Sequence, residues 1–298
     1  MGLLARQLLL QKPMGILYHY TSQAGLLGIL SAKALWASKM QYMNDASEFA
    51  HALEIGKKTI AERTRTADSD KEKKLLKNFE KTLNVISHVH IFVGSLSEAG
   101  DLLSQWRGYC PEGNGFSLGF NPSDLDKALS SQGFKLAPCV YDSEKKKTLL
   151  NELIDDALKA PESQDTNPFS SELNPGLARL SNYVGSVATG FLAEFLNVGP
   201  LLKDDSFSEE KEWRILCGVI PSSDSRFRIR PGKSMLVPYC EIKLHGTDGI
   251  LHIANLIIGP TPHTDLAKLA ADALLNSLSS NGVSGKQVQS SRIPYRGW

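Results

Sequence analysis

The fold is decided by the stretch Leu17-Tyr18-His19-Tyr20-Thr21-Ser22 near the start of the chain. Residues 15–20 combine aromatic and branched side chains behind a Pro-Met-Gly lead-in, which predicts a short buried strand. Thr21 or Ser22 can cap the helix that the following leucines predict, because a side-chain oxygen there accepts a hydrogen bond from an unpaired backbone amide. His19 is therefore expected where the strand leads into the helix, held rigidly and still within reach of a ligand.

Composition and charge are those of an ordinary globular protein. Of the 298 residues, 42% are apolar and 22% are charged, which is enough to bury a real core. The 33 basic and 32 acidic residues leave a formal charge of +1. This balance excludes a bulk polycation, so a nucleic acid would have to be held by a local basic patch.

The chain is expected to be cytoplasmic, with no membrane partner and no metal. No apolar run approaches the roughly 18 to 20 residues that a membrane helix needs. The first ten residues lack the apolar core and cleavage site of a signal peptide, and Arg6 stands where a myristoylation site has Ser or Thr. Four cysteines are scattered without a C-x-x-C pair, which indicates buried free thiols in a reducing compartment.

Strands are expected towards both ends of the chain, with helices between them. Beyond the first strand, further ones are expected at residues 90–97, 116–120, 136–141, 212–219, 226–230, 235–244, 255–260 and 287–292. Helices are expected from Asp45, with Glu48 completing a capping box, from Asp101 to Tyr109, and at 144–160, 177–196 and 264–280, with a solvated helical hairpin at 57–75. This order favours a single α+β domain over residues 1–298, with a helical insertion at about 144–200 and a loop at 161–175 where a lid can sit.

Glu212 is the first candidate for chemistry. On a strand, Glu212 and Arg214 share one face, while Trp213 and Ile215 share the other. An ionised carboxylate on so apolar a strand is costly unless it is paired or faces a polar cleft. Two interpretations follow: an ion pair with Arg214 at a solvated strand end, or a carboxylate that projects into a ligand cleft with Glu210 as a helper.

The other candidates each have a structural alternative. His19 is either a core residue with its hydrogen bonds satisfied or a ligand-binding residue. Ser95 and Ser97 lie at a strand end, where their hydroxyls either cap the next helix or support a substrate. Trp106 and Tyr109 share one face of that helix, a spacing more typical of core packing than of stacking on a ligand.

Several of these segments recur together in a fixed order. They are Tyr18-His19-Tyr20-Thr21, Leu35-Trp36-Ala37-Ser38, Asn44-Asp45 with Glu48, Ser95-Leu96-Ser97 with Asp101, Trp106 and Tyr109, Gly115 to Phe120, Glu210-Lys211-Glu212-Trp213-Arg214, Val237-Pro238-Tyr239, and Ile257-Ile258-Gly259-Pro260. In this order they resemble a large bacterial domain family of unknown function. The resemblance covers about residues 14–262, and the whole string is specific although each piece is weak.

The first of these motifs also resembles the opening of the ADP-ribosyltransferase superfamily, which includes DarT-like DNA-modifying toxins and RNA 2′-phosphotransferases. The resemblance implies a split, β-rich α+β core with NAD bound in a cleft. It implies three catalytic residues, Glu212, His19 and Glu210. The residues that it implies for NAD binding are His19, Tyr20, Thr21, Ser95, Ser97, Trp106, Tyr109 and Arg214.

The chemistry of that superfamily suits these residue types. Cleavage of the nicotinamide–ribose bond builds positive charge on the ribose, as in glycoside chemistry. Glu212 beside the ribose would stabilise this charge more than the ground state. His19 would hold the adenosine-side ribose, Tyr109 or Trp106 would stack on nicotinamide, and Arg214 would meet a phosphate. NAD is the substrate in this scheme, and no metal is required.

The resemblance implies a mono-ADP-ribosyltransferase that serves as an intracellular toxin or phage-defence effector, restrained by an antitoxin or immunity partner. By strict alternation Arg226, Arg228 and Arg230 share a face, and with Lys233 they would form a basic stripe able to meet phosphates. The stripe favours a nucleic-acid base over a protein side chain as the acceptor. Its structural alternative is an edge strand kept soluble by charge.

Three other functions stay open. A two-histidine phosphoesterase would use His19-Tyr20-Thr21 and His245-Gly246-Thr247, although His245 stands in a sequence that predicts a turn. An RNA 2′-phosphotransferase would need arginines clustered around the first histidine, and the sequence shows none. A binding module that keeps the fold without activity would be favoured if Glu212 were buried against Arg214 with no cleft in front of it.

Overall fold

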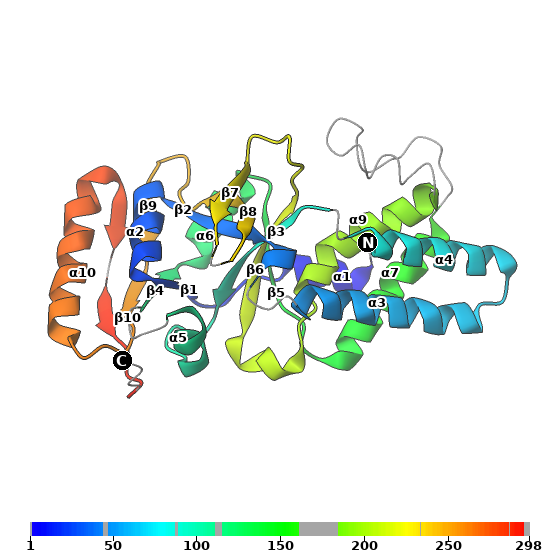
Figure 1. Cartoon of the computed structure of the whole chain (residues 1–298), viewed down its shortest axis with the longest axis horizontal. Coiled ribbons are helices and arrows are strands. Elements are labelled where there is room, and N and C mark those ends of the chain that lie inside the picture. Colours follow the sequence, from blue (N-terminus) through cyan, green and yellow to red (C-terminus); the bar gives the residue numbers. More distant parts are fainter. Residues whose placement is uncertain are drawn as a thin grey trace.

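The computed structural model describes residues 2–43, 47–86, 89–110, 115–160, 184–232, 234–285 and 287–294. The molecule is elongated: strands fill its middle, helices lie beside the strands at its left-hand end, and a larger group of helices forms its right-hand end (Figure 1). This arrangement agrees with the expected α+β class.

A large mixed sheet runs through the molecule. Its strands are β1 (Leu17–Ser22), β2 (Ala34–Lys39), β3 (Ile91–Ser97), β4 (Gly115–Phe120), β5 (Lys135–Pro138), β6 (Glu212–Val219), β7 (Phe227–Pro231), β8 (Leu236–Lys243), β10 (Asn255–Ile258) and β12 (Val288–Ser290). Eight of them follow the order β12-β10-β4-β1-β3-β2-β8-β7, and β6 pairs with both β3 and β5. A small separate sheet joins β9 (Leu251–Ile253) to β11 (Val283–Gly285).

The sheet branches at β3. One edge of β3 pairs with β6 along its length, from Ile91 opposite Val219 to Ser97 opposite Glu212. The other edge is shared, because β2 pairs with it near Phe92 and Val93, whereas β1 meets it at the far end, where Tyr18 lies opposite Ser97. β1 and β2 therefore diverge from each other along the middle of β3.

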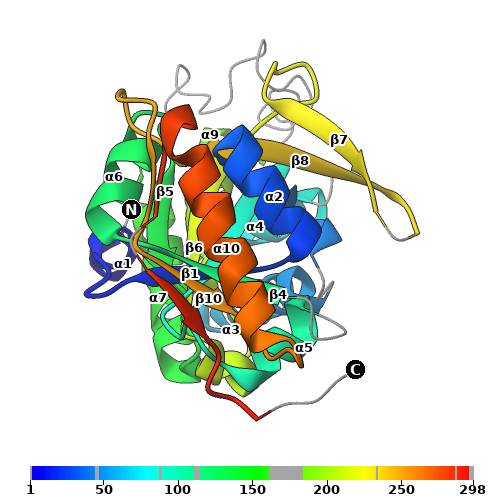
Figure 2. The same cartoon turned by 90° about the vertical axis from the view of Figure 1, so that its left-hand side faces the viewer.

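The described α-helices divide between two faces of the sheet, apart from α5 (Leu103–Tyr109). Those on the two faces are α1 (Leu3–Leu10), α2 (Gln23–Ala32), α3 (Ser47–Thr66), α4 (Asp70–Asn84), α6 (Pro122–Ser130), α7 (Ser143–Lys159), α9 (Ser186–Val198) and α10 (Thr264–Leu278). A core of α1, α3, α4, α7 and α9 packs on one face of β3, β5 and β6. A second core holds α2, α6 and α10 against the opposite face (Figure 2).

Local sequence explains how the elements near the branch begin. Ser22 caps α2, because its hydroxyl accepts a hydrogen bond from the Gly25 amide at 3.1 Å. The short 3-10 helix Asp205–Glu210 ends at Lys211, whose φ of 44° lies in the left-handed region. This sharp turn brings the chain directly into β6 with Glu212 as its first residue.

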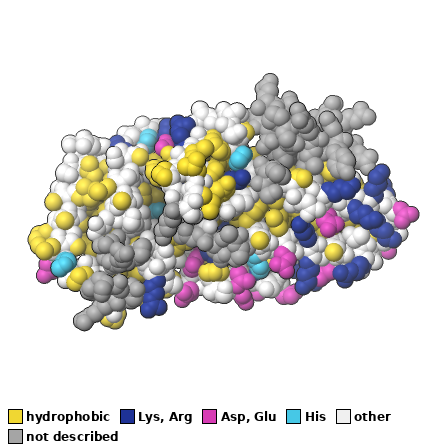
Figure 3. All heavy atoms as spheres, viewed as in Figure 1, with side chains coloured by type: hydrophobic (Ala, Val, Ile, Leu, Met, Phe, Trp, Pro, Cys, Tyr) yellow, Lys and Arg dark blue, Asp and Glu magenta, His cyan; other side chains and the backbone are white. Residues whose placement is uncertain are grey.

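Most expected elements are present near their expected bounds, and β6 has the expected ones. The hairpin of α3 and α4 carries Lys, Arg, Asp and Glu side chains of both signs on its surface, as expected for a solvated face (Figure 3). The helical group is larger than an insertion at 144–200, because α1, α3 and α4 pack together with α7 and α9. Asn44 and Asp45, the loop at 161–175, the start of the helix expected at 177–196, Lys233 and the side chain of Glu48 lie outside the described residues.

Candidate functional site

The divergence of β1 from β2 opens two adjoining cavities along β3. The larger has a volume of about 620 Å³ and lies among β1, α2, β2 and β3, with Arg230 of β7 on its wall. The smaller, of about 40 Å³, is lined by β1, β3 and α5 together with Glu210 and Glu212. Four residues line both cavities, namely His19, Tyr20, Ser95 and Tyr109. The two cavities therefore form one cleft that crosses the branch of the sheet.

His19 spans the gap that the diverging strands leave. Its Nδ1 lies 3.0 Å from the backbone carbonyl oxygen of Ser95. Because a carbonyl oxygen can only accept, Nδ1 carries the proton, and in the neutral ring Nε2 is then an acceptor. Burial lowers the pKa of His19, and the hydrogen bond to Ser95 offsets this only in part, so the ring is neutral at physiological pH. His19 can thus accept a hydrogen bond from a ligand hydroxyl through Nε2 while it stays uncharged.

The carboxylate of Glu212 is held by two buried cations. Only 5% of Glu212 is exposed, and the Arg214 guanidinium beside it is fully buried. Arg214 donates from Nε to Glu212 Oε1 at 2.9 Å and from Nη2 to Oε2 at 3.1 Å, while Lys203 Nζ donates to Oε2 at 2.6 Å. The ion pair expected with Arg214 is therefore present, but it is buried rather than solvated, and Glu212 also lines the smaller cavity.

These contacts fix the charge of Glu212. Burial alone would raise the pKa of its carboxyl group, but Arg214 and Lys203 outweigh burial and lower the pKa from 4.5 to about 2. The carboxylate is consequently ionised at any physiological pH. It can stabilise a cation, but it does not act as an acid near neutrality.

The lowered pKa of Glu212 predicts an acid-labile fold. Because the folded-state pKa lies below the unfolded one, the ionised carboxylate stabilises the native state above about pH 4.5, and this contribution is lost as the pH falls towards about 2. The free energy of unfolding is expected to fall by about 3 kcal/mol, because each unit of difference between the folded and unfolded pKa corresponds to ~1.4 kcal/mol. Denaturant unfolding at pH 6, 4 and 3 measures it. If the free energy of unfolding of Glu212→Gln fell as steeply with decreasing pH as that of the wild type, Glu212 would not be the group responsible.

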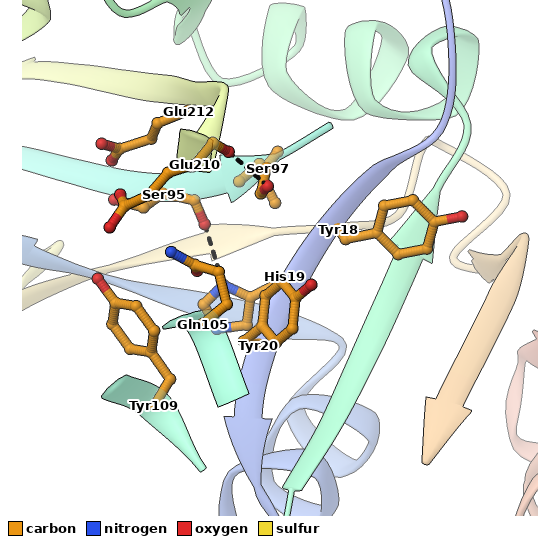
Figure 4. Close-up of a pocket in the computed structure, with 10 residues that line it drawn as sticks. Tyr18, His19, Tyr20, Ser95, Ser97, Gln105, Tyr109, Glu210 and Glu212 are labelled. Carbon is orange, nitrogen blue, oxygen red and sulfur yellow. Dashed lines mark hydrogen bonds between the residues drawn. The ribbon is translucent and has the colours of Figure 1, made fainter. Parts of the chain in front are cut away.

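Polar side chains from β3 and α5 complete the smaller cavity. The Ser97 hydroxyl donates to the carbonyl oxygen of Glu210 at 2.6 Å and accepts from the Ala99 amide at 3.0 Å, so it shapes the turn before β6. The Ser95 hydroxyl is buried and has no hydrogen-bond partner in the described part of the chain. Gln105 and Tyr109 reach in from α5, with their polar ends towards Glu210 (Figure 4).

Aromatic and basic side chains form the far wall of the larger cavity. The register of β2, β8 and β7 places Trp36, Ser38, Tyr239, Arg228 and Arg230 on one face. Trp36 is 51% exposed and lies against Tyr239 with ring centroids 4.6 Å apart. The Arg230 guanidinium lies 5.9 Å from the Trp36 ring, and its Nη2 is 3.4 Å from the Ser38 hydroxyl. The wall offers an aromatic face beside a cation.

The structure brings most of the expected site residues to one place. Those that line the cleft are His19, Tyr20, Thr21, Ser95, Ser97, Tyr109, Glu210 and Glu212. Tyr20 serves the framework as well, since its hydroxyl donates to the Ala99 carbonyl oxygen at 2.6 Å and accepts from the Leu102 amide at 3.0 Å.

Two expectations for binding residues need correction. Trp106 is only 1% exposed and packs edge-on against Tyr20, so it belongs to the core and cannot stack on a ligand. Arg214 points away from the cleft, because its Nη1 donates to the Pro200 carbonyl oxygen at 2.6 Å while its other nitrogens hold Glu212. It is therefore not available to bind a phosphate.

Asp101 does not cap α5, which begins at Leu103 without a side-chain cap. Its carboxylate instead accepts from Trp106 Nε1 at 2.7 Å, Ser291 Oγ at 2.6 Å and the Arg292 amide at 2.8 Å, which ties the end of the described chain to α5. The basic stripe is also shorter than expected. Arg226 precedes β7 and pairs with Asp224 at 2.7 Å, which leaves two arginines on the cavity face.

Sequence reasoning missed three contributors to the cleft: Trp36, Gln105 and Lys203. In the sequence, Trp36 stands out only as part of the motif Leu35-Trp36-Ala37-Ser38, and nothing there shows that its side chain is exposed. Nothing in the local sequence marks Lys203. His245 lies at the base of the expected turn, where it forms an isolated antiparallel bridge with Leu251, and it lines neither cavity of the cleft.

The described residues contain no candidate for a metal site or for a membrane span. No three His, Cys, Asp or Glu side chains there gather closely enough to hold a metal ion. No helix in the same part of the chain combines the length and apolar character needed to cross a membrane.

The chain was compared with known proteins. No curated protein and no solved structure matches it. Residues 105–215, which include most of α5 together with Glu210, Glu212 and Arg214, match the family described as protein of unknown function (DUF2971).

Proposed function

We propose that the chain is an NAD-dependent mono-ADP-ribosyltransferase with a split β-rich core. The observation that carries the proposal is the cleft at the branch of the sheet, where a neutral histidine on β1 and a permanently ionised carboxylate on β6 line the same small cavity. A two-histidine phosphoesterase lacks comparable support, because His245 lies outside this cleft.

The reaction uses charge rather than proton transfer at the bond that breaks. The bond between the nicotinamide nitrogen and ribose C1′ breaks with its electron pair on nicotinamide, which leaves as a neutral base, and positive charge builds on the ribose. Glu212 stabilises that charge and can accept a hydrogen bond from the ribose 2′-hydroxyl. The acceptor then attacks C1′ and loses its proton, for which Glu210 is the nearest further carboxylate.

The two cavities suit the two ends of NAD. The larger, with Trp36 and Arg230 on its wall, suits the adenine ring and the pyrophosphate. In this proposal Arg230, and not Arg214 as the sequence suggested, binds the phosphate groups. The smaller cavity of about 40 Å³ holds a few water molecules but not a pyridine ring. Nicotinamide therefore enters only when the Tyr109 side chain, which is 37% exposed, swings aside and then stacks on it.

Trp36→Ala is expected to weaken ADP-ribose binding by about 10- to 100-fold, since stacking of a base on an aromatic ring contributes ~1–3 kcal/mol. Calorimetric titration of wild type and variant with ADP-ribose measures this. Leu236→Ala is the matched control, because Leu236 is exposed on the opposite face of the β7–β8 ribbon. Equal affinities for wild type and Trp36→Ala would contradict the adenine position.

The proposed acceptor is a nucleic-acid base. Arg228 and Arg230 share one face of the β7–β8 ribbon, which projects from the body of the molecule (Figure 2), and Arg230 lines the larger cavity. Because Trp36 and Arg230 are occupied by NAD in this proposal, Arg228 is the guanidinium group on this face that can meet a phosphate of the nucleic-acid chain. A protein side chain is the alternative acceptor. The roles of toxin or phage-defence effector, and of an antitoxin or immunity partner, belong to the same proposal.

An NAD-binding module without activity is the second candidate. The observation that favours it is the clamp on Glu212, whose oxygens already accept three hydrogen bonds from Arg214 and Lys203. The cleft in front of Glu212 weighs against it.

Incubation with NAD labelled in the adenylate phosphate separates these candidates. Purified protein is offered RNA, single-stranded DNA, duplex DNA and a cell lysate, and labelled products are sorted by nuclease and protease treatment. Label that nuclease releases supports the nucleic-acid transferase, and label that protease releases supports the protein-modifying alternative. Binding of NAD without any label transfer would identify the inactive module.

A further inference from the structure

Lys203 is a buried ammonium group between two carboxylates. It is 2% exposed, and its Nζ lies 2.5 Å from Glu210 Oε2 and 2.6 Å from Glu212 Oε2. It reaches this place from the segment between two short 3-10 helices, Gly199–Leu201 and Asp205–Glu210, rather than from the sheet.

The backbone of Lys203 is anchored on both sides. Its amide donates to the Val140 carbonyl oxygen at 3.1 Å, and its own carbonyl oxygen accepts from Lys146 Nζ at 2.9 Å. Lys146 is itself buried in α7. The ammonium group is thus delivered by a fixed backbone, as a pre-organised site requires.

The charged groups around Glu212 come from several elements. Arg214 shares β6 with it, and Lys203 and Glu210 approach from the segment before β6. The Tyr141 hydroxyl accepts from the Glu212 amide at 2.9 Å, and burial, the largest cause, raises the pKa of Tyr141, so it stays neutral. His19 and Tyr109 face Glu212 across the smaller cavity. Two carboxylates therefore share this site with two cations.

The hydrogen bonds distinguish the two oxygens of Glu212. Oε2 accepts from both Lys203 and Arg214, whereas Oε1 accepts from Arg214 Nε. Each carboxylate oxygen has two lone pairs. These bonds occupy both lone pairs of Oε2 and one of Oε1. Oε1 is therefore the oxygen that can accept a hydrogen bond from a ligand hydroxyl.

We propose that Lys203 is a positioning residue that keeps Glu210 and Glu212 ionised side by side and turns Oε1 of Glu212 towards the cleft. Without Lys203, two nearby carboxylates would repel each other, and one of them would hold a proton into a higher pH range. A protonated Glu212 could not stabilise a ribose cation. The catalytic consequence rests on the proposed transferase activity, whereas the electrostatic role does not.

A carboxyl titration tests the electrostatic role without NAD. Protein labelled with ¹³C at the glutamate carboxyl groups is titrated by NMR, with Glu210→Gln and Glu212→Gln used for assignment. In Lys203→Met we expect the higher apparent pKa of the Glu210–Glu212 pair to rise by about 1–3. In the double variant Lys203→Met/Glu210→Gln, the pKa of the remaining carboxyl group, Glu212, should be lower again, because no second carboxylate repels it. Lys147→Met, which removes an exposed ammonium group that pairs with Glu62 on the surface, should leave the pair unchanged.

The outcomes separate this inference from the proposed function. An unaltered titration in Lys203→Met, or a pKa that stays high in the double variant, overturns the role of Lys203. If Lys203→Met does not fold, the double variant decides: recovery of the fold supports the proposal, and failure contradicts it. Where NAD turnover is measurable, the acid limb of its pH profile should move upward in Lys203→Met and return in Lys203→Arg, which a merely structural role would not produce. A shifted titration without any NAD turnover would leave Lys203 as proposed and remove the transferase.

Discussion

Glu212→Gln is expected to lower the rate of NAD-dependent transfer by at least about 10²–10³-fold, the loss typical when one electrostatic stabiliser is removed. Glutamine keeps the shape of the side chain but has no charge to place beside the developing ribose cation. The effect should fall on kcat, because this interaction strengthens in the transition state. Initial rates with labelled NAD, at saturating and limiting concentrations, separate kcat from KM.

Glu80→Gln is the matched control for this loss. Glu80 is an exposed carboxylate on α4, in the helical group, and lines neither cavity of the cleft. Its replacement should leave the rate within a factor of about two, as expected for a surface site away from the chemistry. Retention of full activity by Glu212→Gln would remove the carboxylate from the mechanism.

Arg214→Met is expected to destabilise the fold by about 3–5 kcal/mol, the usual cost of removing one partner from a buried ion pair. Arg214 is fully buried and bonded to both oxygens of Glu212 and to the carbonyl oxygen of Pro200, so the substitution leaves a buried acceptor and an under-compensated carboxylate. Denaturant unfolding at neutral pH, followed by circular dichroism, gives the free energy of unfolding.

Arg226→Met provides the comparison for Arg214. Arg226 also pairs with an aspartate at 2.7 Å, but its side chain is 47% exposed. Because exposed ion pairs contribute little, the change in free energy should stay below about 1 kcal/mol. Similar losses in the two variants would mean that the buried network has no special role in stability.

The framework of the fold is readable from local sequence because its elements have strong patterns. The alternation in Glu212-Trp213-Arg214-Ile215 places the acid and the arginine on one face, and β6 has this arrangement. Each of the two interpretations of Glu212 describes part of the structure. The ion pair with Arg214 exists, and the carboxylate nevertheless lines a cavity with His19.

The rest depends on contacts between distant segments. Trp36 and Arg230 meet only because β2, β8 and β7 pair in that order, which no local pattern specifies. Lys203 reaches Glu212 from an irregular segment, where periodicity carries no information. Trp106 is drawn into the core because Asp101 accepts its indole N–H, and that carboxylate is fixed in turn by Ser291 from the other end of the chain.

Calorimetric titration of NAD into the wild-type protein, Glu212→Gln and His19→Ala tests the central claim most directly. The account predicts one NAD-binding site in the wild type and a comparable affinity in Glu212→Gln. In His19→Ala the affinity should be at least about tenfold weaker, because the hydrogen bond between the neutral imidazole and the ribose is lost. Absence of heat with wild-type protein at millimolar NAD, or unchanged affinity in His19→Ala, would contradict it.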